Sequence, residues 1–255
     1  MSMTVPGRLD LTELRDFLVA GEVKTEKGEV KVSQRLSLNL CPRVDRRIVI
    51  DGDLKEWEGR PFIELKDATY LAPPDALSHS LWTGPADLSA RVYLGWDDQH
   101  FYFAAHVRDD VAINEAEKET IWSGDSIQIA FDPNNDAVSA VPGYGAEDKE
   151  FSFGYSHKLN APALYRHWPL PPAEPKAELA IKREGDYTAY ELALPFKQLS
   201  PLKPEAGKVF GFSFVVLDRD QGRKVDYWLG LTPGICGGKD PAAFRKFVLV
   251  QEQEK

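Results

Sequence analysis

The sequence predicts an all-β fold: a β-sandwich of jelly-roll or immunoglobulin-like type over residues 46–255. Three observations support this. From Ile48 onward, short stretches alternate between apolar and polar residues, which is the period of a half-buried strand. Turn-forming sequences rich in Asp, Asn, Gly and Pro separate these stretches. Helical patterns are almost absent from this region, so strands must supply the core.

Residues 1–45 are predicted to form an N-terminal extension that carries a short helix. Over residues 10–18, Asp10 and Glu13 form a candidate capping box. Apolar residues at helical spacing accompany it: Leu11, Leu14, Phe17 and Leu18. Residues 35–40 then alternate as a strand.

The sandwich strands follow in order. A hairpin is predicted with arms at 92–96 and 101–107 and a turn at 97–100. The other strand patterns are 48–50, 121–132, 151–155, 177–181, 190–194, 211–217, 225–229 and 247–250. The stretches between them that are rich in Pro or polar residues are predicted as loops: 66–89, 137–149 and 156–175.

Composition narrows the range of partners. A net charge of −9 disfavours nucleic acid and anionic membranes, because phosphate binding requires a basic face. No apolar run approaches the ~18 residues of a membrane span. The N-terminus lacks the basic and apolar regions of a signal peptide, as expected for a cytoplasmic protein or for a secreted one whose signal has been removed.

The two cysteines, Cys41 and Cys236, lie near opposite ends of the chain, and neither has a neighbour at metal-site spacing. They are compatible with one disulfide or with two free buried thiols.

The stretch 121–132 combines a core face with an unusual opposite face. If it is one strand, Asp125, Ile127, Ile129 and Phe131 point to the core. The other face then carries a tryptophan, an amide and small residues: Trp122, Gly124, Ser126, Gln128 and Ala130. Small residues beside an aromatic ring and an amide suit a sugar or another flat polar ligand. Alternatively, Trp122 closes the end of the sandwich.

Six stretches between residues 46 and 250 carry recognisable motifs. They are Ile50–Trp57 (compare DG-x-x-x-E-W), Val92–Tyr102 (W-D-D-x-x-L-Y), Val107–Asp110 (V-x-D), Trp122–Gln128 (W-x-x-D-S-V-E), Tyr190–Phe196 (Y-E-x-x-I-P-W) and Gly211–Asp220 (G-F-x-x-x-x-N-D). In this order they resemble the motifs of family 9 carbohydrate-binding modules.

The resemblance implies a β-sandwich related to DOMON domains that binds polysaccharide ends, holds structural calcium and is extracellular or periplasmic. Family members grip a sugar ring between two tryptophans, which the resemblance matches to Trp122 and Trp228. Gln128 stands where the family has a glutamate. An amide donates and accepts hydrogen bonds but has no charge, so the charge-assisted bonds of a carboxylate would be lost.

The remaining tryptophans divide by pattern. Trp57 and Trp96 occupy apolar faces and are expected in the core. Trp82 and Trp168 lie in predicted loops and could line a site; Trp82 is included among the candidate ligand-binding residues.

Acidic residues form a candidate calcium site. Asp109, Asp110 and Asp125 flank one acidic loop, and Asp51 with Asp53 form a second candidate pair. The alternative is that these aspartates cap turns. A haem is not expected, because the methionines Met1 and Met3 lie outside the predicted sandwich.

Three functions remain open. The first is non-catalytic carbohydrate binding, by a monomer or by part of a larger chain. The second is a structural or interaction sandwich that has lost the sugar site. The third is a glycoside hydrolase, for which Asp125 and Glu191 are the conceivable carboxylate pair. The sequence contains no other catalytic motif that we recognise.

Overall fold

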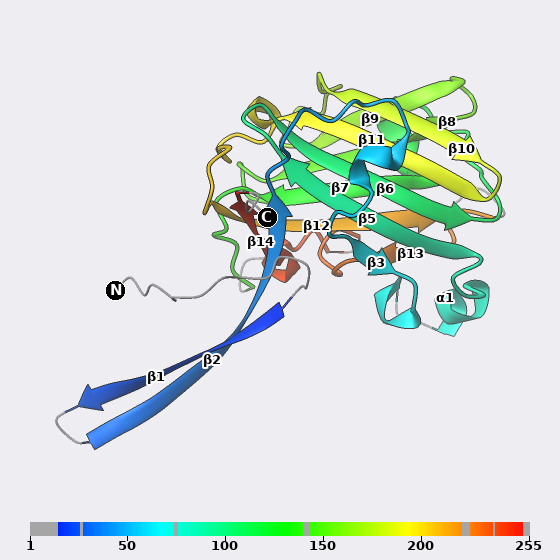
Figure 1. The fold of residues 1–255 in the computed structure, drawn as a ribbon. Helices are drawn as coiled ribbons and strands as arrows, with labels where there is room; N and C mark the ends of the chain where they lie inside the picture. Colours follow the sequence, from blue (N-terminus) through cyan, green and yellow to red (C-terminus); the bar gives the residue numbers. More distant parts are fainter. Residues whose placement is uncertain are drawn as a thin grey trace.

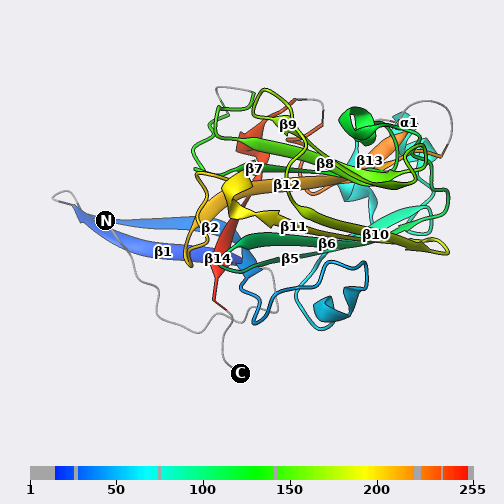
Figure 2. The same ribbon diagram turned by 90° about the horizontal axis from the view of Figure 1, so that it is seen from above.

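Two β-sheets lie face to face, with the core between them (Figures 1 and 2). The computed structural model describes residues 15–25, 28–73, 76–139, 143–220, 225–236 and 238–251. Within these residues the larger sheet has nine strands and the smaller has five. The predicted all-β sandwich is confirmed.

The larger sheet has the order β1-β2-β14-β12-β7-β8-β9, with β13 paired to β12 and β4 paired to β13. Its strands are β1 (Arg15–Thr25), β2 (Gly28–Pro42), β4 (Leu71–Ala72), β7 (Ser126–Asp132), β8 (Lys149–Ser156), β9 (Ala161–Trp168), β12 (Val209–Asp218), β13 (Tyr227–Gly230) and β14 (Arg245–Val250). All pairs are antiparallel except β14 with β2.

The smaller sheet is antiparallel throughout, with the order β10-β11-β6-β5-β3. Its strands are β3 (Ile63–Leu65), β5 (Leu88–Trp96), β6 (His100–Asp109), β10 (Glu178–Glu184) and β11 (Tyr187–Pro195). Strands β5 and β6 form the hairpin predicted from the alternation around residue 98.

Phenylalanines from both sheets fill the core. Phe131 on β7 lies edge-to-face with Phe101 on β6, at 5.1 Å between ring centroids, and 4.8 Å from Phe212 on β12. Phe103 on β6 meets Phe214 on β12 at 5.7 Å. All five rings are fully buried, and each contributes about 1.5–3 kcal/mol of transfer free energy.

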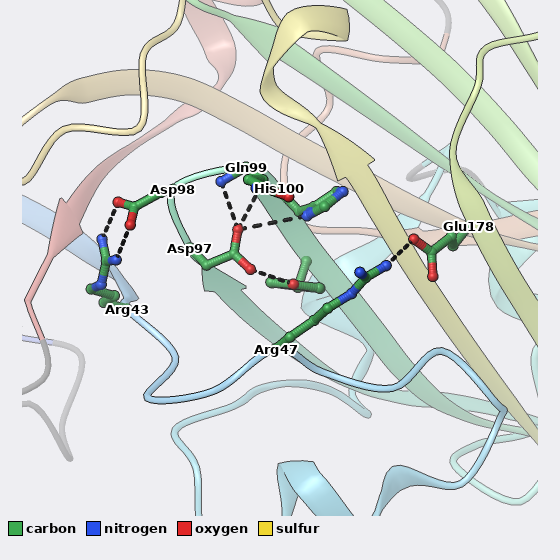
Figure 3. A network of polar contacts seen from close by, with 8 residues as sticks. Arg43, Arg47, Asp97, Asp98, Gln99, His100 and Glu178 are labelled. Carbon is green, nitrogen blue, oxygen red and sulfur yellow. Dashed lines mark hydrogen bonds and ion pairs between the residues drawn. The ribbon is translucent and has the colours of Figure 1, made fainter.

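A polar network fixes the β5–β6 turn to the chain that leaves β2 (Figure 3). Asp97 accepts hydrogen bonds from the backbone N–H groups of Gln99 and His100, both at 2.7 Å. Arg43 forms a bidentate ion pair with Asp98, at 2.7 and 2.6 Å. This ion pair holds the segment after β2, which leaves the larger sheet, against the β5–β6 turn of the smaller sheet.

Short helices connect the strands of the described chain, and none of them is long and apolar enough to cross a membrane. They are the 3₁₀ helices η1 (Leu54–Trp57), η2 (Ala68–Tyr70), η3 (Lys118–Ser123), η4 (Phe196–Gln198) and η5 (Pro241–Ala243), and the α-helix α1 (Ala76–Leu81).

The N-terminal helix expected over residues 10–18 is wrong for residues 15–18, which belong to β1; residues 10–14 lie outside the described residues. The register pairs β1 with β2 along its whole length, and these backbone hydrogen bonds override a weak local helix signal. The hairpin projects from the sandwich (Figures 1 and 2). Residues Asn39–Pro42 of β2 pair with β14, and the division at residue 45 remains a prediction.

The stretch 156–175, expected to be irregular, contains β9. Pro162 is tolerated there because β9 is the last strand in its sheet order and needs hydrogen bonds on one side only.

We predict that Phe131→Ala lowers the free energy of unfolding by about 3–5 kcal/mol, because it leaves a cavity in the core between the two sheets. Leu170→Ala, a control at a side chain 65% exposed, should change it by less than about 0.5 kcal/mol. Urea unfolding measures both, and similar losses in the two variants would contradict the assignment of the core.

Candidate functional site

Strand β7 divides its side chains between the core and the outer face of the larger sheet. Ile127 and Ile129 belong to the main core cluster, as predicted. Ala130 belongs to a different cluster on the opposite face, and Gln128 has the same parity as Ala130. The predicted alternation is therefore confirmed from Ser126 to Asp132.

The register brings Gln128 and Trp228 onto the same face. Gln128 is paired with Val215 on β12, and Val215 is paired with Gly230 on β13. Trp228 lies two residues before Gly230, so its side chain has the same orientation on β13. Two strand spacings, about 10 Å, separate β7 from β13. The structure thus unites two residues that are 100 positions apart in the sequence.

The chain after β13 folds back over this face. Ile235 and Phe244 pack with Ala130, Val215 and Leu217, and we call these five residues the outer cluster. Trp228 and Cys236 pack against the outer cluster. The Cys236 thiol donates to Oε1 of Gln128 at 3.4 Å, and Gln128 is only 5% exposed.

Polar groups on β8 and β9 extend the site away from Trp228. Ser152, paired with Gln128, has a buried Oγ without a hydrogen-bond partner among the described residues. Nε2 of His167 is also buried without a hydrogen-bond partner among the described residues, and burial lowers the pKa of this imidazole. Nearby, the buried Glu150 binds Nζ of Lys239 through both carboxylate oxygens at 2.6 Å. These groups can donate to or accept from a polar ligand.

Trp122 is not on the strand, which corrects the alternation proposed for 121–125. It lies in η3 and is 43% exposed, so it neither lies in β7 nor fills the core. The cause is a turn held by Asn114, whose side-chain amide donates to the carbonyls of Ile121 at 2.8 Å and Asp125 at 3.0 Å. An exposed indole at this position is free to contact a ligand.

The other tryptophans have structural contacts. Trp57 and Trp96 are 1% exposed, which confirms the core prediction. Trp82 follows α1, packs against the core and donates its indole N–H to the Leu88 carbonyl at 3.0 Å. Trp168 donates to the Gly145 carbonyl at 2.6 Å. No described contact joins Trp82 to Gln128 or Trp228.

An acidic cluster lies where β6, β7 and β12 end or begin. Carboxylate oxygens of Asp109, Asp125 and Asp218 lie within 4.8 Å of one another, and all three residues are buried. Asp110 joins Asp109 and Asp220 in an adjoining group. The predicted set of Asp109, Asp110 and Asp125 thus lies in one region, but sequence reasoning missed Asp218, the last residue of β12, whose signals were the predicted hairpin turn and the motif at Gly211–Asp220.

The acidic cluster holds more negative charge than its surroundings compensate. Burial and the Asp109 carboxylate raise the pKa of Asp125 to about 9. Burial also raises the pKa of Asp218 to about 8, against the opposing effect of a hydrogen bond with Tyr227. Arg183 lies 3.4 Å from Asp109. Oxygen ligands at this spacing suit a hard divalent cation.

The other predicted acidic pairs have different roles. Asp51 and Asp53 accept backbone hydrogen bonds that form the turn into η1, at 2.8 and 3.3 Å. Glu191 is fully buried and accepts from the Trp57 indole at 2.9 Å and from Gly52 N at 2.7 Å. The side chain of Glu191 lies on the outer face of β11, away from the core. Asp125 lies near Tyr190, which faces the core between the two sheets. The two carboxylates therefore do not flank a common cleft.

Both cysteines are free. Cys41 is fully buried in the core, where burial raises its pKa, and Cys236 lies beside Gln128. The two cysteines therefore do not form a disulfide, and the alternative of two free thiols is confirmed.

Comparisons with known proteins bear on this arrangement. A family described as "Carbohydrate family 9 binding domain-like" matches residues 64–251. No curated protein matched the chain. A family 9 carbohydrate-binding module from Caldicellulosiruptor kristjanssonii, solved with cellotriose, is 19% identical with a TM-score of 0.62, over 85% of this chain and 96% of its own. The same kind of module from that organism, solved with glucose, is 20% identical with a TM-score of 0.61, over 85% and 98%.

The turn before β7 provides a test of how the site is built. A Cβ on Gly124 would lie 2.6 Å from the Ile113 carbonyl oxygen, so Gly124→Ala should displace the turn and cost about 1–3 kcal/mol of stability. Gly145→Ala is the matched control, because its Cβ would meet nothing nearer than 3.6 Å. Thermal unfolding measures the stability of both variants. A melting temperature of Gly124→Ala equal to that of wild type would show that the close packing at Gly124 is not required.

Proposed function

Because the chain belongs to the carbohydrate family 9 binding domain-like family, we propose that it binds carbohydrate without cleaving it, on the outer face of the larger sheet around Gln128 and Trp228. The observation that carries this proposal is the register, which turns Gln128 and Trp228 to the same face across β12. An aromatic ring and an amide at this distance suit one sugar ring and its hydroxyls.

The residues divide the work of binding between them. The Trp228 indole offers an apolar surface to the C–H face of the ring, and Gln128 can both donate to and accept from hydroxyls. Ser152 and His167 supply further polar atoms. We propose the exposed Trp122 as the opposing wall and Trp82 as a peripheral contact. An amide in place of a carboxylate at position 128 favours neutral sugars held by neutral hydrogen bonds, which are weaker than charge-assisted ones.

The relatives suggest the first ligands to test. The modules from Caldicellulosiruptor kristjanssonii were solved with cellotriose and with glucose. A protein that binds such glycans would be extracellular or periplasmic, alone or as part of a larger carbohydrate-active chain.

A second candidate is an interaction sandwich that has lost the sugar site. Gln128 is 5% exposed and its oxygen already accepts from Cys236, which favours this alternative. If wild type binds no glycan and Gln128→Glu gains binding, the alternative holds.

We also propose that the acidic cluster holds calcium. Asp109, Asp125 and Asp218 supply carboxylate oxygens that lie within 4.8 Å of one another, as the ligands of a hard cation do. The ion would neutralise the buried charge, and the residues would keep the ends of β6, β7 and β12 together. Calcium therefore has a structural role here and takes no part in holding the sugar.

We predict that wild type binds cellotriose in isothermal titration calorimetry, and that Trp228→Ala weakens binding about five- to thirtyfold through loss of about 1–2 kcal/mol of aromatic contact. Trp122→Ala should weaken it as well. Tyr187→Ala, which removes an exposed ring from the opposite sheet, is the control and should bind like wild type. Unchanged affinity in Trp228→Ala would refute this site.

We predict that saturating calcium raises the melting temperature by several degrees, because a ligand bound only by the folded state adds about 2.7 kcal/mol at 100 times its Kd. Asp218→Asn should remove this response, while the exposed control Asp45→Asn keeps it. Without calcium, Asp218→Asn should melt close to wild type at pH 7, because burial raises the pKa of Asp218 to about 8 and its carboxyl is then mostly neutral, like the amide. A calcium response in Asp218→Asn equal to that of wild type would contradict the site.

A further inference from the structure

The outer face of the smaller sheet is covered over only one half. There the chain from Val44 to Trp57 packs on Tyr102, Ala104 and Ala193. The other half, towards the end of β6 and the start of β11, has no such cover among the described residues, and its side chains line two surface hollows. This uncovered half lies on the opposite side of the sandwich from Gln128 and Trp228.

A flat aromatic ledge forms the centre of the uncovered half. Tyr187 on β11 stacks on His106 of β6, with 4.8 Å between ring centroids and an interplanar angle of 11°. Tyr187 is 42% exposed. Burial and the neighbouring Arg91 lower the pKa of His106. The stacked pair leaves part of the Tyr187 ring open to solvent.

A hollow lies on each side of the ledge. One has a volume of about 960 Å³ and is lined by Lys182 and by the turn from Gly52 to Lys55. The other, of about 370 Å³, is lined by Arg91 and Arg108. Tyr187 and His106 line both hollows, so a ligand lying on the ledge could extend into each. This shape suits a chain of several sugar units rather than one small molecule.

The charge of this face differs from that of the whole chain. Around the ledge, Arg91 and Lys66 pair with Glu64, and Lys55 pairs with Asp53. Arg108 forms no ion pair with any described residue, although the chain carries a net charge of −9. Lys182 differs, because it shares its hollow with the carboxylates of Asp53, Glu58 and Glu184. The Arg108 guanidinium lies 5.8 Å from the Tyr187 ring, so charge and aromatic surface adjoin.

We propose that this face is a second saccharide site, independent of the first, which binds an acidic glycan: a sugar ring packs on the exposed part of Tyr187, whose other side His106 supports, and a carboxylate of the glycan faces Arg108. An unpaired cation favours an anionic ligand, and Arg108 can bind a carboxylate in a planar geometry. The aromatic ledge selects a ring with an apolar face over an acidic peptide. One unpaired arginine is too few for a nucleic acid, whose binding depends on many phosphate contacts.

Isothermal titration with hexagalacturonate, a chain of uronic acid sugars, tests this proposal. We expect wild type to bind it, and both Tyr187→Ala and Arg108→Gln to bind it about tenfold more weakly. Lys176→Gln, a charge-matched substitution at an exposed lysine, should bind like wild type. Because each altered side chain lies at the surface or is half-buried, a melting curve of each variant confirms that it folds.

The outcomes separate this site from the first one. Trp228→Ala should keep its affinity for hexagalacturonate, and Tyr187→Ala should keep its affinity for cellotriose. The proposal is overturned if folded wild type does not bind hexagalacturonate, or if Tyr187→Ala binds it unchanged. It is also overturned if polyglutamate competes as strongly as the uronate chain, because charge alone would then explain the binding. Failure of cellotriose to bind would refute only the first site.

Discussion

The register between β12 and its neighbour β7 is the constraint on which the rest of the structure depends. It sets Phe214 beside Ile129 in the core and Val215 beside Gln128 on the outer face. A shift by one residue would turn the phenylalanines to solvent and Gln128 into the core. The core therefore fixes the outer face: the burial of aromatic rings between the sheets specifies which side chains can meet a ligand.

The same register also explains the acidic cluster. The last pair of the β7–β12 ladder is Ser126 with Leu217, and the next residues along each strand are Asp125 and Asp218. Two carboxylates are thereby held together at the end of the sandwich, where burial raises the pKa of both. Keeping both carboxyls ionised in this buried position costs free energy, and this cost is the physical reason that we propose a cation there.

Much of the fold could be predicted from local pattern, whereas the site depended on contacts that are distant in sequence. Alternation was sufficient for the β5–β6 hairpin and for the burial of Trp96. Helical spacing gave a wrong prediction at residues 15–18, where strand pairing prevailed, and alternation failed at Trp122, where Asn114 holds a turn that interrupts it. Asp218 could not be grouped with Asp109 from sequence, because only the folded sheet brings them together. The order of the motifs indicated the family, but it did not predict that the chain after β13, with Cys236, covers Gln128.

The central claim is that the outer face of β7, β12 and β13 receives a neutral saccharide. The most direct measurement is two-dimensional ¹H–¹⁵N NMR of the labelled protein during addition of cellotriose. We expect the side-chain amide of Gln128 and the indole N–H of Trp228 to shift in a saturable manner, together with backbone amides of β13, while the amides around Tyr187 stay unchanged. Saturable shifts confined to the other sheet, or none anywhere, would contradict the claim.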